Sequence, residues 1–159
     1  MSATSQPVVR PNDDRPVGRV DPRGQRFAAT ITAVVLGVAL VAIGSPFATV
    51  LIGLQFAVFA VGVLGGPART PYAQMFARVV RPRIGAPAET EDARPPRFAQ
   101  AVGGVFALVG LVASLAGLTA VAAVAVGFAL AAALLNAVTG FCLGCEMYLL
   151  VRRVAPQRA

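Results

Sequence analysis

The chain has 159 residues, of which 57% are hydrophobic and only 13% are charged, and its mean hydropathy is +0.72. Soluble domains usually carry about 25% charged residues, so much of this chain is expected to have lipid as its solvent. The net charge of +7 does not indicate nucleic-acid binding, because the arginines lie between apolar segments and not on one basic face. The absence of His excludes Ser-His-Asp and Cys-His catalysis and His-based metal sites.

Residues 1–23 are predicted to be a disordered, proline-rich basic arm, and residues 24–156 to be the membrane domain. The arm carries too little apolar surface to fold on its own. The apolar run 27–43 that follows is long for the core of a signal peptide, and no clear small-x-small cleavage site ends it. We therefore interpret it as an uncleaved first membrane helix.

Four apolar segments are predicted to cross the membrane, near residues 27–44, 47–65, 98–116 and 118–137. Each has about 18–20 residues without a charge, which at about 1.5 Å per residue matches a hydrocarbon core of about 30 Å. Each pair of segments is joined by only a few residues, which forces two antiparallel hairpins. The predicted fold is therefore all-α: an integral membrane four-helix bundle made of two tandem hairpins.

The arginines predict the orientation of these hairpins. Five of the fourteen lie in residues 1–26, six in 66–97 and three in 152–158, and the two hairpin turns have none. Basic residues are enriched on the cytosolic side of membrane proteins. We therefore expect a multi-pass protein of the bacterial inner membrane with both termini and the central loop in the cytosol.

A weak internal repeat relates the two hairpins. Arg26-Phe27-Ala28 opens the first, and Arg97-Phe98-Ala99 opens the second, 71 positions later. Each hairpin is followed by a segment that begins with Tyr, bears arginine and ends in Pro, which aligns Tyr72 with Tyr148. The halves would then share one orientation and be related by an axis along the membrane normal. The alternative is that any two membrane hairpins with basic flanks look alike.

The segments after the hairpins are predicted to be amphipathic helices in the headgroup layer, over about residues 71–82 and 141–154. In the first, apolar side chains such as Met75 and Phe76 fall on one helical side and Arg78 toward the other. An interfacial anchor is the simplest interpretation. A docking surface for a soluble partner is the alternative.

Both cysteines of the chain lie in the second of these segments, at Cys142 and Cys145. A bend near Gly140 would place them at a cytosolic helix start, where a spacing of three puts both sulfurs on one face and free backbone amides favour thiolate. A reducing cytosol disfavours structural disulfides, so such a pair is more often catalytic or metal-binding.

We predict thiol–disulfide exchange or sulfane-sulfur transfer with a soluble partner, with no cofactor and no metal. Cys142, nearer the helix start, would attack or carry a persulfide, and Cys145 would resolve the mixed disulfide. Asn136 and Glu146 would support the site by holding water or positioning the partner.

Other interpretations stay open from the residues alone. The cysteines could serve as small apolar residues in a helix rich in Ala and Gly. They could capture a metal with ligands from a partner or a second copy, since two thiolates cannot complete a tetrahedral zinc site. The chain could also be part of a transporter for a sulfur species, although no span contains an ionisable residue before Glu146. A non-catalytic scaffold is the last alternative, and whether the chain forms a homo-oligomer is also open.

Three stretches of the chain resemble a known family. They are Val20-Asp21-Pro22-Arg23-Gly24-Gln25-Arg26-Phe27, Pro95-Pro96-Arg97-Phe98-Ala99-Gln100 and Gly140-Phe141-Cys142-Leu143-Gly144-Cys145-Glu146. Over about residues 20–155 the chain resembles the DUF4395 proteins of actinobacteria and their relatives. The resemblance implies a four-span membrane protein, often encoded beside thioredoxin-like and rhodanese-type proteins, which are therefore the expected partners. It carries over no catalytic residues.

Overall fold

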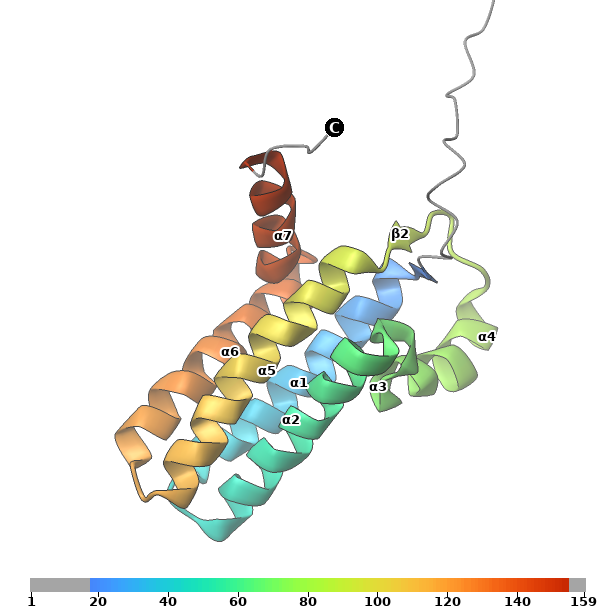
Figure 1. Ribbon diagram of the computed structural model, residues 1–159. Coiled ribbons are helices and arrows are strands. Elements are labelled where there is room, and N and C mark those ends of the chain that lie inside the picture. The colour runs from blue at the N-terminus through green and yellow to red at the C-terminus, as the bar shows by residue number, and fades with distance from the viewer. Residues whose placement is uncertain (1–17, 155–159) are drawn as a thin grey trace, which may run out of the picture.

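The computed structural model describes residues 18–154, and its framework is four long helices lying side by side (Figure 1). These helices are α1 (Pro22–Val41), α2 (Pro46–Gly65), α5 (Arg94–Leu115) and α6 (Thr119–Thr139). In the described part of the chain, these four are long and apolar enough to cross a membrane. The predicted all-α class and its four spans are confirmed.

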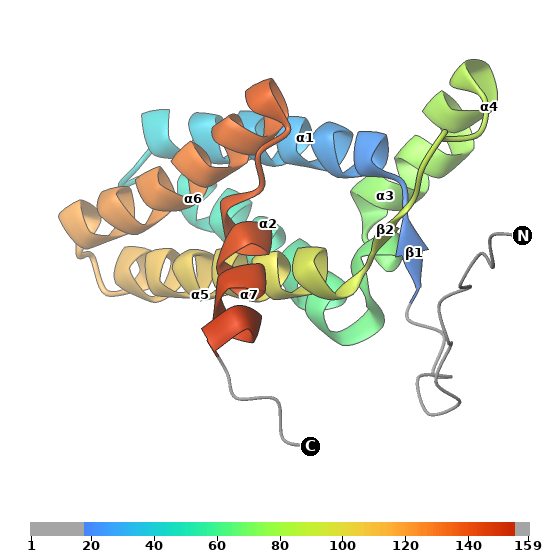
Figure 2. The same ribbon diagram turned by 90° about the horizontal axis from the view of Figure 1, so that it is seen from above.

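The remaining elements gather at the end of the bundle opposite the hairpin turns. They are β1 (Arg19–Val20), η1 (Pro67–Arg69), α3 (Pro71–Met75), the π-helical turn η2 (Phe76–Val80), α4 (Arg81–Ile84), β2 (Glu91–Asp92) and α7 (Leu143–Val154). Helix α7 and the α3–α4 segment project from opposite sides of the bundle (Figure 2). The first expected interfacial helix is thus interrupted by a π-turn, and the second begins two residues later than expected.

The start of α1 is set by a local cap. The Asp21 carboxylate accepts a hydrogen bond from the Arg23 backbone N–H at 3.0 Å, and Pro22 occupies the first turn, where its missing N–H costs nothing. The Arg23 guanidinium also pairs with Asp21 at 3.0 Å, and this hydrogen bond lowers the pKa of the carboxyl group. These contacts begin the helix five residues before the predicted apolar span.

A two-stranded pairing joins the segment before α1 to the central loop. Strands β1 and β2 are antiparallel, with Arg19 opposite Asp92 and Val20 opposite Glu91. The predicted disordered arm includes residues 18–23, but the structure places most of these in β1 and in the first turn of α1; residues 1–17 of the predicted arm lie outside the described part. This pairing spans more than seventy positions of sequence and was not predicted.

The four helices approach closely because small residues lie at their contacts. Helix α2 packs mainly against α5, and α1 mainly against α6. A Cβ added at Gly103 would come within 2.9 Å of the Phe59 ring, and one at Gly110 within 3.1 Å of Val126. In lipid the hydrophobic effect does not drive helices together. Van der Waals contacts at such close approach therefore supply much of the free energy of helix association.

Two arginines make equivalent contacts across the halves. Arg26 of α1 donates from Nη2 to the carbonyl oxygens of Ala137 and Val138 at the end of α6, at 3.3 and 3.1 Å. Arg97 of α5 donates from Nε to the carbonyl of Val63 at the end of α2, at 2.6 Å. A cation at a helix C-terminus satisfies free carbonyls and complements the helix dipole. Each hairpin therefore provides the arginine that caps the last helix of the other hairpin.

Aromatic contacts repeat in the same way and correct the predicted alignment. The rings of Phe27 and Phe76 lie 5.7 Å apart, and those of Phe98 and Tyr148 lie 5.8 Å apart. Phe27 corresponds to Phe98, so the structural counterpart of Tyr148 is Phe76 and not Tyr72. The Tyr72 hydroxyl instead donates to Gln55 Oε1 at 3.0 Å. These matched contacts support the internal repeat.

Candidate functional site: a dithiol beside a cavity between the helices

The cysteine segment begins where α6 is stopped. Gly140 adopts a left-handed conformation with φ of +77°, which side chains disfavour, and its N–H donates to the Asn136 carbonyl at 2.9 Å. Thr139 Oγ1 then accepts from the Phe141 N–H at 3.0 Å. The expected bend is therefore present, and a new helix starts directly after it.

Cys142 is the N-terminal cap of α7. Its carbonyl accepts the first hydrogen bond of the helix, from the Glu146 N–H at 3.0 Å. Its sulfur accepts hydrogen bonds from the backbone N–H groups of Gly144 and Cys145. A side-chain acceptor at this position satisfies free amides of the first turn. The sulfur thus sits where a helix stabilises negative charge.

The other half of the repeat has a threonine at the same place. Thr70 caps α3, and its Oγ1 accepts from the Ala73 N–H at 3.3 Å. Thr70 precedes Cys142 by 72 positions, and Phe76 precedes Tyr148 by the same number. In one half the cap is an inert hydroxyl, and in the other it is an ionisable sulfur with a second thiol one turn away.

The two cysteines form an asymmetric pair. Both are free and partly buried, and their closest atoms are 2.6 Å apart. The hydrogen bond from the Cys145 thiol lowers the pKa of Cys142 to about 7, and the backbone amides act in the same direction against burial. The same hydrogen bond raises the pKa of Cys145, and burial adds to this. Near neutral pH, Cys142 is therefore the more readily ionised of the two thiols, and Cys145 is the protonated thiol beside it.

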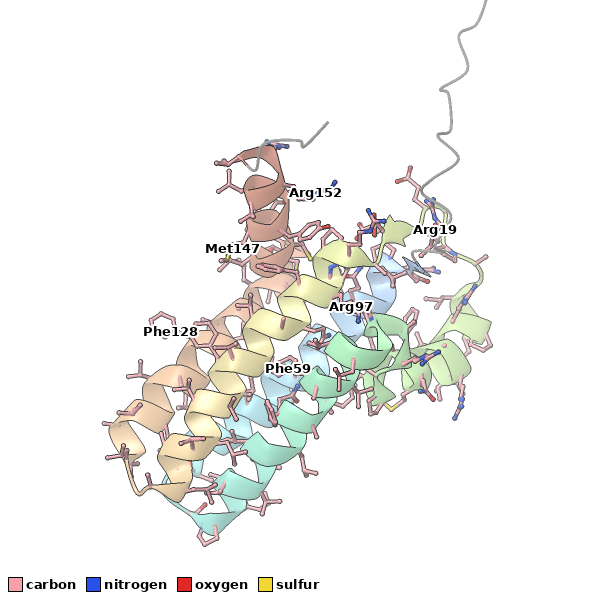
Figure 3. All side chains as sticks on the ribbon, viewed as in Figure 1. Arg19, Phe59, Arg97, Phe128, Met147 and Arg152 are labelled. Atoms are coloured by element: carbon pink, nitrogen blue, oxygen red, sulfur yellow. The ribbon has the colours of Figure 1, made fainter. Side chains whose placement is uncertain are left out.

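Cys142 lines a cavity of about 440 Å³ in the half of the bundle that carries the short helices. Side chains from all four long helices, from α3 and from α7 contribute to its wall, which is mostly apolar. Phe59, Phe128 and Met147, labelled in Figure 3, line it from α2, α6 and α7. Cavities of this size commonly hold small molecules.

The cavity wall also carries a few polar groups from within the apolar spans. Thr32 lines the cavity and accepts a hydrogen bond from Gln55 Nε2 at 3.3 Å, and Gln55 is fully buried. Gln100 lines it from α5, and its buried Oε1 has no hydrogen-bond partner in the structure. Buried amides are costly in a lipid-exposed bundle, so the cavity that they surround is a candidate binding site.

Comparison with known sequences decides the family. A sequence profile described as "Domain of unknown function (DUF4395)" matches residues 20–153, which is most of the chain. The chain belongs to the DUF4395 family. No curated protein and no solved structure matches it.

In this DUF4395 protein, the predicted site residues come close together at one end of the bundle. Asn136 lines the same cavity as Cys142, on the last turns of α6. Glu146 lies in the first turn of α7, is exposed, and contributes to raising the pKa of Cys145. In residues 18–154, no three His, Cys, Asp or Glu side chains gather to hold a metal.

Glu91 and the side-chain amides of the spans, Gln55 and Gln100, were not predicted from the sequence as site residues. The negative charge of Glu91, on β2, acts on both cysteines, and its carboxylate accepts a hydrogen bond from Gln25 Nε2 at 3.2 Å. The central loop therefore places a negative charge near enough to the dithiol to raise both cysteine pKa values, which nothing in its composition indicated. Gln55 and Gln100 did carry a signal, because each is an amide inside an otherwise apolar span.

Proposed function

We propose that this DUF4395 protein is a membrane-anchored thiol oxidoreductase or sulfur-transfer protein of the bacterial inner membrane. The observation that carries the proposal is that Cys142 caps a helix, accepts a hydrogen bond from the Cys145 thiol and borders a cavity. Two cysteines that only filled space would need none of these three features. A thioredoxin-like or rhodanese-type protein on the cytosolic side is the expected partner.

The exchange needs two steps. The Cys142 thiolate attacks one sulfur of the partner's disulfide, which forms a mixed disulfide and releases the partner's other sulfur as a thiolate. The Cys145 thiol then loses its proton and attacks the Cys142 sulfur, which forms the Cys142–Cys145 disulfide and releases the reduced partner. In sulfur transfer, Cys142 takes one sulfane sulfur as a persulfide, and the donor leaves as a thiolate.

Thiol labelling of inverted membrane vesicles tests the proposal. Cys142 should react rapidly with a maleimide, mild diamide should abolish the reaction, and thioredoxin should restore it. Cys145→Ser should accumulate a mixed disulfide with the natural partner, because the resolving thiol is gone. The matched control, Cys142→Ser, should accumulate none. Slow labelling that diamide leaves unchanged, together with no mixed disulfide in Cys145→Ser, would show that the cysteines only pack.

The orientation gives a separate prediction. The described arginines lie on β1, the first turns of α1 and α5, η1 to α4, and α7, all at the end of the bundle that holds the dithiol. We expect this end to face the cytosol. Reporter fusions after Arg10, Glu91 and Arg158 should give cytosolic signal, and a fusion after Ser45 should give periplasmic signal. A periplasmic signal after Glu91 would overturn this orientation.

A further inference from the structure

The Cys142 sulfur borders a cavity that a folded protein cannot enter. The cavity lies between the four long helices, and Cys142, Phe59 and Gln100 are all on its wall. Cys145 does not line the cavity and is partly buried one turn further along α7. A soluble partner can reach the dithiol only from outside the bundle. The cavity side of Cys142 is therefore free for a second, small reactant.

This cavity extends to the lateral surface of the bundle. Phe128 lines the cavity and is also 61% exposed on α6, where Figure 3 shows its ring pointing outward. Its ring lies 5.9 Å from that of Phe106 on α5, another lining residue. In a membrane, this face of α5 and α6 meets lipid. A molecule dissolved in the bilayer would thus reach the cavity without passing through water.

We propose that the cavity binds a membrane quinone, which accepts two electrons from the Cys142–Cys145 dithiol. This inference rests on the proposed thiol function and adds the second substrate class of the same site. A planar ring suits the aromatic and apolar wall, and an isoprenoid tail suits the exposed, lipid-facing edge of the cavity at Phe128. A quinone is the class of bilayer-dissolved molecule that takes up electron pairs.

The polar groups of the wall favour a quinone over a lipid chain or elemental sulfur. Gln100 Oε1 is a buried acceptor without a donor that packs against Gly62 of α2, and rotation of the Gln100 amide would present it to the hydroxyl group of a quinol, which is a donor. On the opposite wall, Thr32 Oγ1 accepts from Gln55, so its own hydrogen remains available for a quinone oxygen. An acyl chain or a sulfur ring has no group that would satisfy either residue.

The reaction balances within these components. The two sulfurs lose two electrons and form one S–S bond, and the quinone gains two electrons. The quinone also takes up two protons, one from the Cys145 thiol and one from water, because Cys142 is already a thiolate. The exchange with the soluble partner then runs in the reverse of the direction given above: a partner thiolate attacks the Cys142 sulfur and releases Cys145, and the partner's second thiolate attacks the mixed disulfide and releases Cys142. Electrons would pass from that partner through the dithiol to the quinone.

Purified protein in quinone-free liposomes tests this inference. The protein is reduced, freed of reductant and mixed with duroquinone, whose fully substituted ring disfavours thiol addition. We expect one quinone to be reduced for every two thiols lost, and no reduction by Cys142→Ser. Ala132→Phe fills the cavity from α6 and should slow the reaction by about tenfold or more, because it removes the space for the ring. Ala131→Phe, at an exposed position that does not line the cavity, is the matched control and should react within about twofold of the natural protein.

The outcomes distinguish the quinone proposal from the proposed thiol function. An unchanged thermal midpoint shows that a variant is folded, and Ala132→Leu replaces Ala132→Phe if the latter does not fold. Equal quinone reduction by the Ala132 and Ala131 variants would show that the cavity is not the site. A protein that exchanges disulfides with its partner but reduces no quinone would overturn this inference alone. A protein with an unreactive Cys142 would overturn the thiol function as well.

Discussion

Alkylation of Cys142 is expected to be half-maximal near pH 7 and to level off about one pH unit higher, whereas an ordinary thiol keeps accelerating toward its pKa of 9.0. The rate of alkylation falls toward low pH because the pKa of Cys142 is lowered to about 7, and the reactive thiolate is protonated as the pH falls through that value. Cys145 should be alkylated more slowly than Cys142 over this range, because its pKa is raised. Iodoacetamide rates measured by mass spectrometry on each cysteine, between pH 5 and 10, report the two profiles separately.

The hydrogen bond from Cys145 is the first cause of this shift, so Cys145→Ala should move the midpoint upward. A hydrogen bond to a charged group contributes about 1.5–3 kcal/mol, which corresponds to about one to two pH units. Alkylation at pH 7 should fall accordingly. Cys145→Ser, which keeps a donor, is the control and should shift the midpoint less. An unchanged midpoint in Cys145→Ala would mean that the amides of α7 alone stabilise the thiolate.

Gly144→Ala should detach the first turn of α7 from the bundle. A Cβ at this position would lie 2.7 Å from both Cα and Cβ of Ala99, and neither atom belongs to a flexible side chain. Overpacking of this kind typically costs about 1–3 kcal/mol. Because Cys142 lies two residues away, its distance from the cavity should change too. We expect a lower thermal midpoint and faster labelling of Cys142 by a bulky, membrane-impermeant maleimide.

Gly127→Ala is the matched control for this change. It lies within α6, and a Cβ there would have no neighbour within 4 Å. Replacing a helical glycine by alanine should leave stability unchanged or raise it by up to about 1 kcal/mol. If Gly144→Ala and Gly127→Ala behave alike in melting and in labelling, close contact between α7 and α5 does not position the dithiol.

The four spans and the bend before the cysteines could be predicted because they depend on local signals. Uninterrupted apolar stretches set the helix lengths, and Gly140 stops α6 by its own conformation. The start of α1 was placed too late because the span was drawn from hydropathy alone. The cap formed by Asp21 and Pro22 is a polar signal that hydropathy does not contain.

The cavity and the register of the repeat could not be predicted, because they depend on how helices rotate against each other. Tyr72 and Tyr148 look equivalent in the sequence, yet ring contacts equate Tyr148 with Phe76. The same shift makes Thr70 the counterpart of Cys142. The position of the Glu91 charge near the site depends on strand pairing between segments that lie far apart in the chain.

The reciprocal arginine caps bear on the origin of the fold. Arg26 completes the end of α6 and Arg97 completes the end of α2, so carbonyl groups in the last turn of each hairpin are satisfied by the other hairpin. Two copies of one ancestral hairpin, associated as a symmetric homodimer, would make both contacts identically. Duplication and fusion of its gene would preserve them within one chain. Once the copies were joined, the two equivalent cap positions could diverge, with Thr70 in one half and Cys142 in the other.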